Sequence, residues 1–133
     1  MNHPPLQDQP TWRPAKEIAP EADAHLREIL KRCSPCTYYA TRQFRATGDR
    51  ERLPTILLGI IERYVPAELR AKLKHANDAL RLHEDLGIDS LSLMEIGLLA
   101  EDVLQIVITD EEMQHLHTLG DIRRLMDRRV GGL

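Results

Sequence analysis

The sequence predicts an all-α protein, and three observations support this fold class. Apolar residues recur at three- and four-residue steps along most of the chain, which is the period of a helix with one buried face. Residues that favour helix starts stand before these segments, notably Ser34 with Pro35 and Asp89 with Ser90. Only residues 106–108 alternate like a strand, and they are too few to form a sheet without partners. We expect them to bury alternate aliphatic side chains under the helices.

The N-terminal part predicts a polar segment followed by two helices. Residues 1–18 are expected to be disordered, because their prolines oppose regular structure and little there can be buried. A first helix is predicted from residue 20 to about residue 31. A second helix begins after Ser34 and ends at Gly48. Segment 19–48 is therefore a helical N-terminal extension, which either packs on the rest of the domain or binds a dedicated partner.

The next segment is the most apolar of the chain. Residues 50–64 predict a core helix, because aliphatic side chains fill its centre. A long connection follows, from Val65 to Asp89. Within it, residues 66–73 predict an extra short helix with Leu69 and Leu73 on one face.

Residues 80–96 contain the most informative position, Ser90, at the predicted start of another helix. Gly87 can adopt positive φ, and Asp89 favours the position before a helix. Two sets of apolar residues follow at helical spacing: the first is Leu91, Met94 and Leu98, and the second is Ile96, Leu99 and Val103. Ser90 is therefore expected to be exposed in the first turn. Unpaired N–H groups and the positive end of the helix dipole suit a phosphate-linked group there, although a serine at this position can also serve only as a helix cap.

The C-terminal part predicts two short helices. Thr109 with Glu112, and Thr118 with Asp121, have the spacing of capping boxes. Four arginines close the chain and suit a helix C-terminus, either as solvated surface or as a site for an acidic partner: Arg123, Arg124, Arg128 and Arg129.

Charge is distributed unevenly along the chain. Residues 82–122 contain ten acidic residues and no lysine or arginine, so their local charge is −10, while the remainder carries +7 and the whole chain −3. Such an acidic surface attracts basic partners in a salt-sensitive way, although acids can also simply solvate a helix face. Nucleic acid is not an expected partner, because the basic residues are interspersed with acids.

The chain length of 133 residues and the composition indicate one small domain with an appended segment. No run of eighteen apolar residues predicts a membrane span, and the N-terminus lacks the apolar core of a signal peptide. We expect a cytoplasmic protein.

Cys33 and Cys36 form a Cys-Ser-Pro-Cys motif, which permits three interpretations. Cys33 follows the apolar register of the first helix, which favours a structural role. Redox exchange remains open, although the flanks look helical rather than like an α/β unit. A zinc site also remains open, although His115 and His117 are spaced too closely for the usual ligand pair.

The stretch from Asp85 to Leu91, Asp-Leu-Gly-Ile-Asp-Ser-Leu, resembles the acyl carrier protein family, whose members carry 4′-phosphopantetheine on the serine of a DSL motif. Three later segments resemble the family in the right order: Glu95-Ile96, residues 104–111 and residues 118–122. The resemblance covers about residues 54–128. It implies an acyl-carrier-like four-helix bundle over residues 49–133, with extra N-terminal helices and a longer first loop.

The resemblance implies a carrier and not an enzyme. A phosphopantetheinyl transferase would attach the arm to Ser90, flanked by Asp89 and Leu91, and the thiol of the arm would hold acyl groups as thioesters. No catalytic residue and no metal is implied. Partner enzymes would be acyl-ACP synthases, ketosynthases or acyltransferases with basic docking patches, and the expected contact residues are Glu95, Glu101, Asp102 and Leu93. Leu93 can alternatively pack under the inserted segment.

The family also implies an acyl pocket between the helices. We expect it near Leu57, Ile61, Met94, Leu98 and Leu99, which are equally ordinary core positions. The extra helices favour a specialised fatty-acid or lipid pathway, for example one that supplies lipopolysaccharide. The alternatives are a peptidyl or polyketide carrier and a carrier-like interaction module that is not modified.

Overall fold

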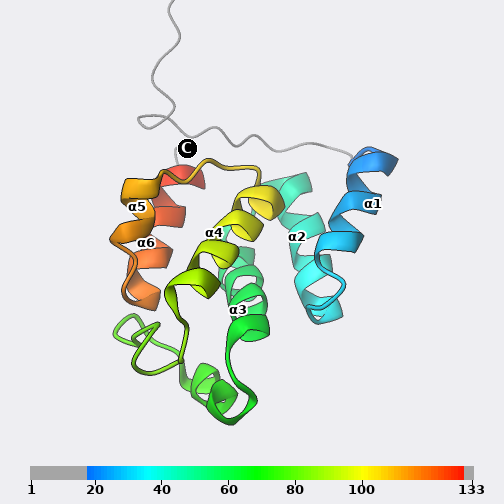
Figure 1. Ribbon diagram of the computed structural model, residues 1–133. Helices are drawn as coiled ribbons and strands as arrows, with labels where there is room; N and C mark the ends of the chain where they lie inside the picture. Colours follow the sequence, from blue (N-terminus) through cyan, green and yellow to red (C-terminus); the bar gives the residue numbers. More distant parts are fainter. Residues whose placement is uncertain (1–17, 131–133) are drawn as a thin grey trace, which may run out of the picture.

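The computed structural model describes residues 18–130 (Figure 1). The predicted disordered segment 1–18 lies outside the described residues except for Ile18. The described chain forms helices and two 3₁₀ segments: α1 (Pro20–Ile29), α2 (Pro35–Thr47), η2 (Arg50–Arg52), α3 (Leu53–Tyr64), η3 (Ala67–His75), α4 (Ser90–Leu104), α5 (Asp110–Gln114) and α6 (Leu119–Val130). Within residues 18–130 there is one isolated β-bridge, between Arg81 and Thr118, and no strand. The predicted all-α fold class is confirmed.

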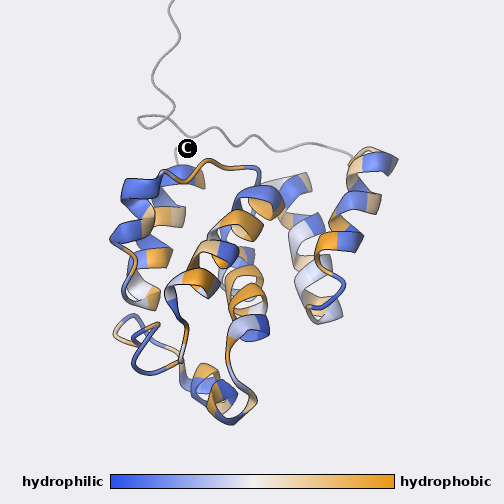
Figure 2. Ribbon diagram, viewed as in Figure 1, coloured by the Kyte–Doolittle hydropathy of each residue, from blue (hydrophilic) through white to orange (hydrophobic). Residues whose placement is uncertain are grey.

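Helix α3 provides the centre of the core, as its sequence predicts. Its buried residues are Leu53, Ile56, Leu57, Ile60 and Ile61. The helix packs against both α2 and α4. Figure 1 shows α1 and α2 on one side of α4, and α5 and α6 on the other. Hydrophobic residues concentrate on α3 and α4, whereas α5 and the η3 region are mostly hydrophilic (Figure 2).

The N-terminal extension packs on the bundle and shares its hydrophobic core. Leu26 and Leu30 of the first helical segment, and Ala40 and Phe44 of α2, belong to the same buried cluster as α3 and α6. Helix α2 ends at Gly48 with φ 74°, as predicted. The expected Ser34 side-chain cap was wrong, because the Ser34 hydroxyl lies 3.3 Å from the Thr37 hydroxyl and does not bond to a backbone N–H.

The connection between α3 and α4 is anchored at two places. The short helix expected over residues 66–73 is present as the 3₁₀ segment η3, and its Leu69 and Leu73 pack against the core. Further along, Leu82 N–H donates to His117 O at 2.9 Å and Leu119 N–H donates to Leu80 O at 3.0 Å. The segment that leads to Ser90 is thereby fixed to the start of α6.

The C-terminal capping boxes are confirmed. Thr109 and Glu112 exchange side-chain to backbone bonds at the start of α5. Thr118 and Asp121 do the same before α6, with 3.2 Å from Asp121 N to Thr118 Oγ1 and 3.0 Å from Thr118 N to Asp121 Oδ2. Residues 106–108 bury alternate side chains, since Ile106 is buried and the next residue is exposed. None of the described helices has the length and hydropathy that crossing a membrane requires.

The C-terminal arginines do not behave alike. Arg123, Arg124 and Arg128 are exposed, as the solvated-surface interpretation predicts. For Arg129 that interpretation was wrong, because it is buried, pairs with Glu112 and donates to Val107 O at 3.1 Å. Arg129 therefore holds α6 against the segment that precedes α5.

Candidate functional site

Ser90 is the first residue of α4 and its side chain is exposed, as predicted. Asp89 caps the helix, because its Oδ1 accepts a hydrogen bond from Ser92 N–H at 2.7 Å. Gly87 has φ 68°, and a Cβ on it would lie 3.1 Å from a Leu69 methyl group, so the turn before the serine requires glycine. Ile88 N–H donates to Leu82 O at 3.0 Å and closes this turn. Ser90 is thus presented outward from a well-defined loop.

The ionisable side chains around Ser90 are carboxylates and histidines. Hydrogen bonds from Ser92, its backbone N–H first, hold the pKa of Asp89 below its usual value, so this carboxylate is ionised at neutral pH. The charged and titratable residues that line the adjoining groove are Asp89, Glu84, Glu101, Asp110, His83 and His117. His83 lies beside the turn, with its Nδ1 3.2 Å from Ile88 O.

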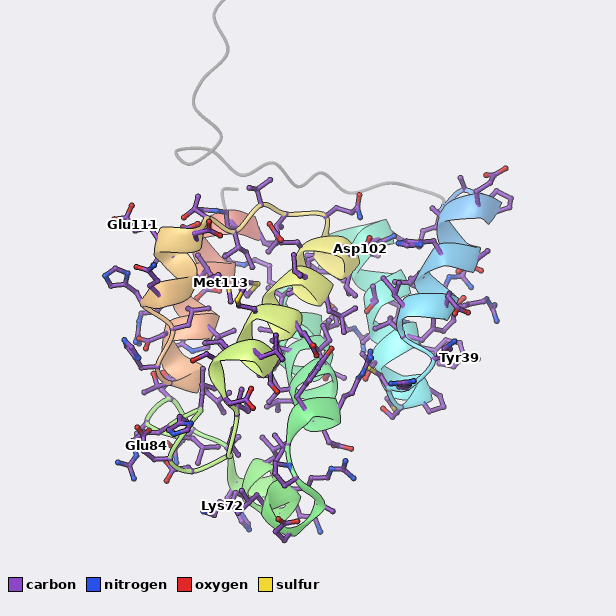
Figure 3. The ribbon with its side chains drawn as sticks, viewed as in Figure 1. Tyr39, Lys72, Glu84, Asp102, Glu111 and Met113 are labelled. Carbon is purple, nitrogen blue, oxygen red and sulfur yellow. The ribbon has the colours of Figure 1, made fainter. Side chains whose placement is uncertain are left out.

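A groove of about 730 Å³ is lined by Ser90 and lies between α4, α5 and the segment that precedes α4. We call it the front groove. Its apolar wall includes Leu93, Met94 and Leu98 of α4, and Met113 reaches it from α5. Gly97 permits this approach, because a Cβ there would lie 2.6 Å from Met113 Sδ. Figure 3 shows Met113 between the two helices.

Behind the front groove lies an inner cavity of about 20 Å³ lined by apolar residues. It shares Leu93, Gly97, Ile108 and Leu116 with the front groove, so the two spaces are adjacent. Its size admits roughly one water molecule.

The predicted acyl-pocket residues divide between these spaces. Leu57 and Ile61 line the inner cavity, as expected of interior positions. For Met94 and Leu98 the interior interpretation was wrong, because their side chains are 57% and 64% exposed and line the front groove. Leu99 packs against the core without lining either space. The helical period alone did not decide which of the two apolar stripes of α4 faces inward.

The predicted partner-binding residues also differ in their surroundings. Glu95 is exposed, as is Leu91, which flanks Ser90. Leu93 is half-buried against the core, which favours packing over partner contact. Glu101 accepts a hydrogen bond from Ile108 N–H at 2.8 Å, and Asp102 Oδ2 lies 2.7 Å from His25 Nε2 (Figure 3 labels Asp102).

Sequence reasoning missed the residue that anchors the end of α4. Arg45 of α2 is buried and donates to Asp102 O at 2.8 Å and to Val103 O at 2.9 Å. It satisfies carbonyl groups of the last turn, which have no backbone donor within their own helix, and Asp102 O also accepts from Gln105 Nε2 at 2.6 Å. A signal was available, because Arg45 follows Thr41 by four residues and therefore lies on the buried face of α2.

The two cysteines differ in exposure. Cys33 packs against the core, and burial raises the pKa of its thiol, which lowers its reactivity. Cys36 is exposed. Within residues 18–130 no group of three or more histidine, cysteine or acidic side chains is arranged to hold a metal ion. The structural interpretation of Cys33 is supported, and the redox hypothesis stays untested.

Comparison with known proteins gives a consistent result. Residues 67–126 match the family model for the phosphopantetheine attachment site. The acyl carrier protein of Wolinella succinogenes is 31% identical over 67 residues, which are 50% of this chain and 88% of that protein. That of Phenylobacterium zucineum is 28% identical over 71 residues, 53% of this chain and 90% of that protein. The meromycolate extension acyl carrier protein of Mycolicibacterium smegmatis is 46% identical over 39 residues, 29% of this chain and 39% of that protein. No solved structure matches the chain.

Proposed function

The chain belongs to the acyl carrier protein family, and we propose that Ser90 is the residue to which its 4′-phosphopantetheine is attached. Members of this family are carriers and not enzymes, and the phosphopantetheine arm is their covalent cofactor. The observation that carries the choice of Ser90 is its position: it is an exposed residue, the first of α4, and it lines the front groove.

The surroundings of Ser90 fit a phosphodiester. No hydrogen bond within the described chain occupies its hydroxyl, so Oγ is free to attack a phosphorus atom. The start of α4 offers backbone N–H groups and the positive end of the helix dipole to the phosphate that would result. Asp89 opposes this charge, but its carboxylate is directed to Ser92 N–H and fixes the helix start. Ser92 itself is half-buried and less accessible than Ser90.

The transfer reaction takes place in the active site of a phosphopantetheinyl transferase. Ser90 Oγ forms a new bond to the phosphorus next to the pantetheine arm and loses its proton to the transferase or to solvent, while the pyrophosphate P–O bond of coenzyme A breaks and the nucleotide part leaves with the other phosphate. The terminal thiol of the arm then holds acyl groups as thioesters. This chain contributes a fixed, exposed attachment point, and tethering keeps the cargo at high effective concentration beside each docked enzyme.

The proposed docking surface is the start of α4. Leu91, Met94 and Leu98 form an exposed apolar stripe, and Glu95 adds a negative charge to it. The partners proposed for this surface are the transferase and acyl-ACP synthases, ketosynthases or acyltransferases with basic patches around an apolar contact. Glu101 and Asp102, also expected to bind partners, are engaged in contacts within the protein.

The proposed pathway is a specialised branch of fatty-acid or lipid biosynthesis in the cytoplasm. Two features support a specialised carrier. One is the extension formed by α1 and α2. The other is the similarity to a meromycolate extension acyl carrier protein.

Intact mass spectrometry tests the attachment site. The full chain is incubated with coenzyme A and a broad-specificity phosphopantetheinyl transferase, beside the variants Ser90→Ala and Ser92→Ala. The second variant is a matched control, because it removes a hydroxyl from the same helix turn. We expect a gain of one phosphopantetheine in the native chain and in Ser92→Ala, and none in Ser90→Ala.

Two outcomes would reject the proposal. Modification of Ser90→Ala would place the arm on another residue. If the native chain stays unmodified with several transferases, the chain is an interaction module with the carrier fold.

A further inference from the structure

Two histidines are the side chains of the front groove that can carry a positive charge. The described residues that line this groove include His83 and His117 but no lysine or arginine. The acidic residues that line it are Glu84, Asp89, Glu101 and Asp110. A phosphodiester on Ser90 adds a negative charge to walls that are already acidic. Among the side chains of the groove, only a protonated histidine can balance that charge.

His83 is tied to the turn that leads to Ser90. Gly87 N–H donates to His83 O at 2.9 Å, and Ile88 N–H donates to Leu82 O at 3.0 Å. The imidazole itself contacts the turn, because its Nδ1 lies 3.2 Å from Ile88 O. These bonds join His83 to the residues that stand two and three positions before Ser90. The same turn therefore positions the imidazole and the attachment point.

The bond to Ile88 determines which ring nitrogen of His83 is available. A carbonyl oxygen can only accept, so Nδ1 carries a hydrogen and donates to Ile88 O. In the neutral ring, Nε2 then has no hydrogen and cannot donate to an anion. A proton taken from solvent places a hydrogen on Nε2 and makes the ring a cation. Only this form of His83 can bind a phosphate oxygen.

The carboxylates near His83 have partners of their own in several cases. Asp89 accepts from Ser92 N–H at 2.7 Å, and after the hydrogen bonds from Ser92 the charge of His83 helps to hold the pKa of Asp89 below its usual value. The imidazole thus acts on the residue next to Ser90. The ionisable side chains from the loop, α4, α5 and the segment before α6 that surround His83 are Arg81, Glu84, Asp85, Asp89, Glu101, Asp110 and His117.

Arg81 and Asp85 neutralise each other at 3.3 Å, and Glu101 accepts from Ile108 N–H at 2.8 Å. A phosphodiester on Ser90 has two free oxygens and a full negative charge. It is therefore a stronger partner for an imidazolium than a carboxylate that already accepts a hydrogen bond.

We propose that protonated His83 binds the phosphodiester of the arm on Ser90 through Nε2–H, an inference that rests on the proposed function. His83 is a positioning residue in this arrangement. It holds the root of the arm beside the turn at Gly87 and away from the exposed apolar stripe of α4, which stays accessible to partners. Above neutral pH the ring is uncharged and the root of the arm is released.

The experiment compares three proteins with and without the arm. The native chain, His83→Gln and His117→Gln are loaded with unacylated phosphopantetheine from coenzyme A, and loading is verified by mass. His117→Gln is the matched control, because His117 is also an exposed histidine that lines the front groove. Histidine ring resonances and the ³¹P resonance of the phosphodiester are followed by NMR from about pH 5 to pH 8. The phosphodiester itself stays ionised throughout this range.

We expect the midpoint of the His83 titration in the native chain to rise by roughly half a pH unit when the arm is attached, which is the size of shift an exposed ion pair gives. The His117 midpoint should move less. The ³¹P resonance should move with the His83 midpoint in the native chain and in His117→Gln, and should stay constant in His83→Gln. At pH 5.5 the His83 ring should show nuclear Overhauser contacts to the methylene group next to the phosphate, and these should weaken at pH 8.

The outcomes separate this inference from the function on which it rests. If the native chain gains no mass, the carrier function and the role of His83 are both rejected. If the chain loads but the His83 midpoint is the same with and without the arm, only the role of His83 is rejected. A ³¹P movement that persists in His83→Gln, or disappears in His117→Gln, would also overturn the inference. Should His83→Gln fail to load, the loaded and unmodified native chains still decide the question.

Discussion

The two ends of α4 have opposite surroundings. At its start, Ser90 and Leu91 are exposed, and the cap from Asp89 is local. At its end, Arg45 of α2 holds the last carbonyl groups, and Asp102 lies 2.7 Å from His25 of α1. One helix therefore combines a free end, where the arm is proposed to be attached, with an end that is anchored to the N-terminal extension.

This difference bears on how partners reach the carrier. The ten acidic residues of segment 82–122 predict an attractive surface for basic proteins. In the structure, Glu101 and Asp102 already have partners within the chain, whereas Glu95 is exposed beside the apolar stripe. Contacts within the chain therefore leave the start of α4, the proposed docking surface, as the more accessible end of the helix.

The largest expected effect comes from releasing the anchored end. Arg45→Met keeps an apolar side chain in the buried site but leaves the Val103 carbonyl group without its donor, while the Asp102 carbonyl group still accepts from Gln105 Nε2 at 2.6 Å. An unsatisfied buried polar group costs about 1–3 kcal/mol, so we expect the free energy of unfolding to fall by about 1–3 kcal/mol. Urea unfolding measures this change. The loading rate of Ser90 at low temperature should stay the same, because the free end is untouched.

Arg42→Met serves as the control for that measurement. Arg42 is an exposed arginine of the same helix, 3.7 Å from Asp23. We expect it to cost less than about 1 kcal/mol. Equal destabilisation by the two variants would show that the buried arginine does not anchor α4.

The second prediction concerns docking. Leu91→Ala removes an exposed leucine beside Ser90, and Asp102→Asn removes a charge at the other end. Burying a leucine side chain in an interface contributes about 1.5–3 kcal/mol, so losing most of that contact should lower kcat/KM of a phosphopantetheinyl transferase at least tenfold. Asp102→Asn should lower it less than about twofold, because the carboxylate is directed to His25. A larger fall of kcat/KM in Asp102→Asn than in Leu91→Ala would show that the transferase contacts the end of α4 rather than its start.

The starts of α4, α5 and α6 could be predicted from the sequence, because hydrogen bonds between residues close in sequence determine them. The turn at Gly87, the Asp89 cap and both capping boxes depend on residues within four positions of each other. Their spacing is visible in the sequence, and the structure confirms it. The resemblance around Ser90 and the family comparison then agree on the phosphopantetheine attachment region.

The rest depends on contacts between distant segments. The spacing of Leu91, Met94 and Leu98 shows a helical stripe, but only the packing of α3 shows that the opposite stripe is buried. Likewise, Arg45 meets Val103 across 58 positions, and no local pattern indicates which carbonyl group a buried arginine will find. The inner cavity and the front groove arise in the same way, from side chains of several helices.

The third prediction uses pH to separate the two ends. The backbone N–H of Ser92 contributes most to holding the pKa of Asp89 below its usual value, which is about 3.9 in an unfolded chain. A lowered pKa stabilises the folded state above that value, and this contribution is lost as pH falls through the lowered pKa. The start of α4 should therefore loosen in acid. Its end should not loosen for this reason, since arginine stays charged.

Amide resonances report this difference. In an NMR titration from pH 6 to pH 2, the Ser92 N–H resonance should move with an apparent pKa below 3.9. In Asp89→Asn, which keeps a good capping side chain without a titrating group, that movement should disappear. If the Ser92 resonance moves equally in both proteins, another carboxylate controls the start of the helix.

The smallest expected effect tests the second contact at the anchored end. His25 and Asp102 are close, but their side chains are 55% and 38% exposed, so water and salt screen the pair. His25→Gln should therefore change the free energy of unfolding by less than about 0.5 kcal/mol. His75→Gln, at an exposed position of η3, is the matched control. A change well above that of the control, and equal at low and high salt, would mean that α1 anchors α4 as firmly as the buried Arg45 of α2 does. The anchored end would then depend on both helices of the extension, and removing α1 would release Asp102 but not Glu101, which accepts from Ile108 N–H.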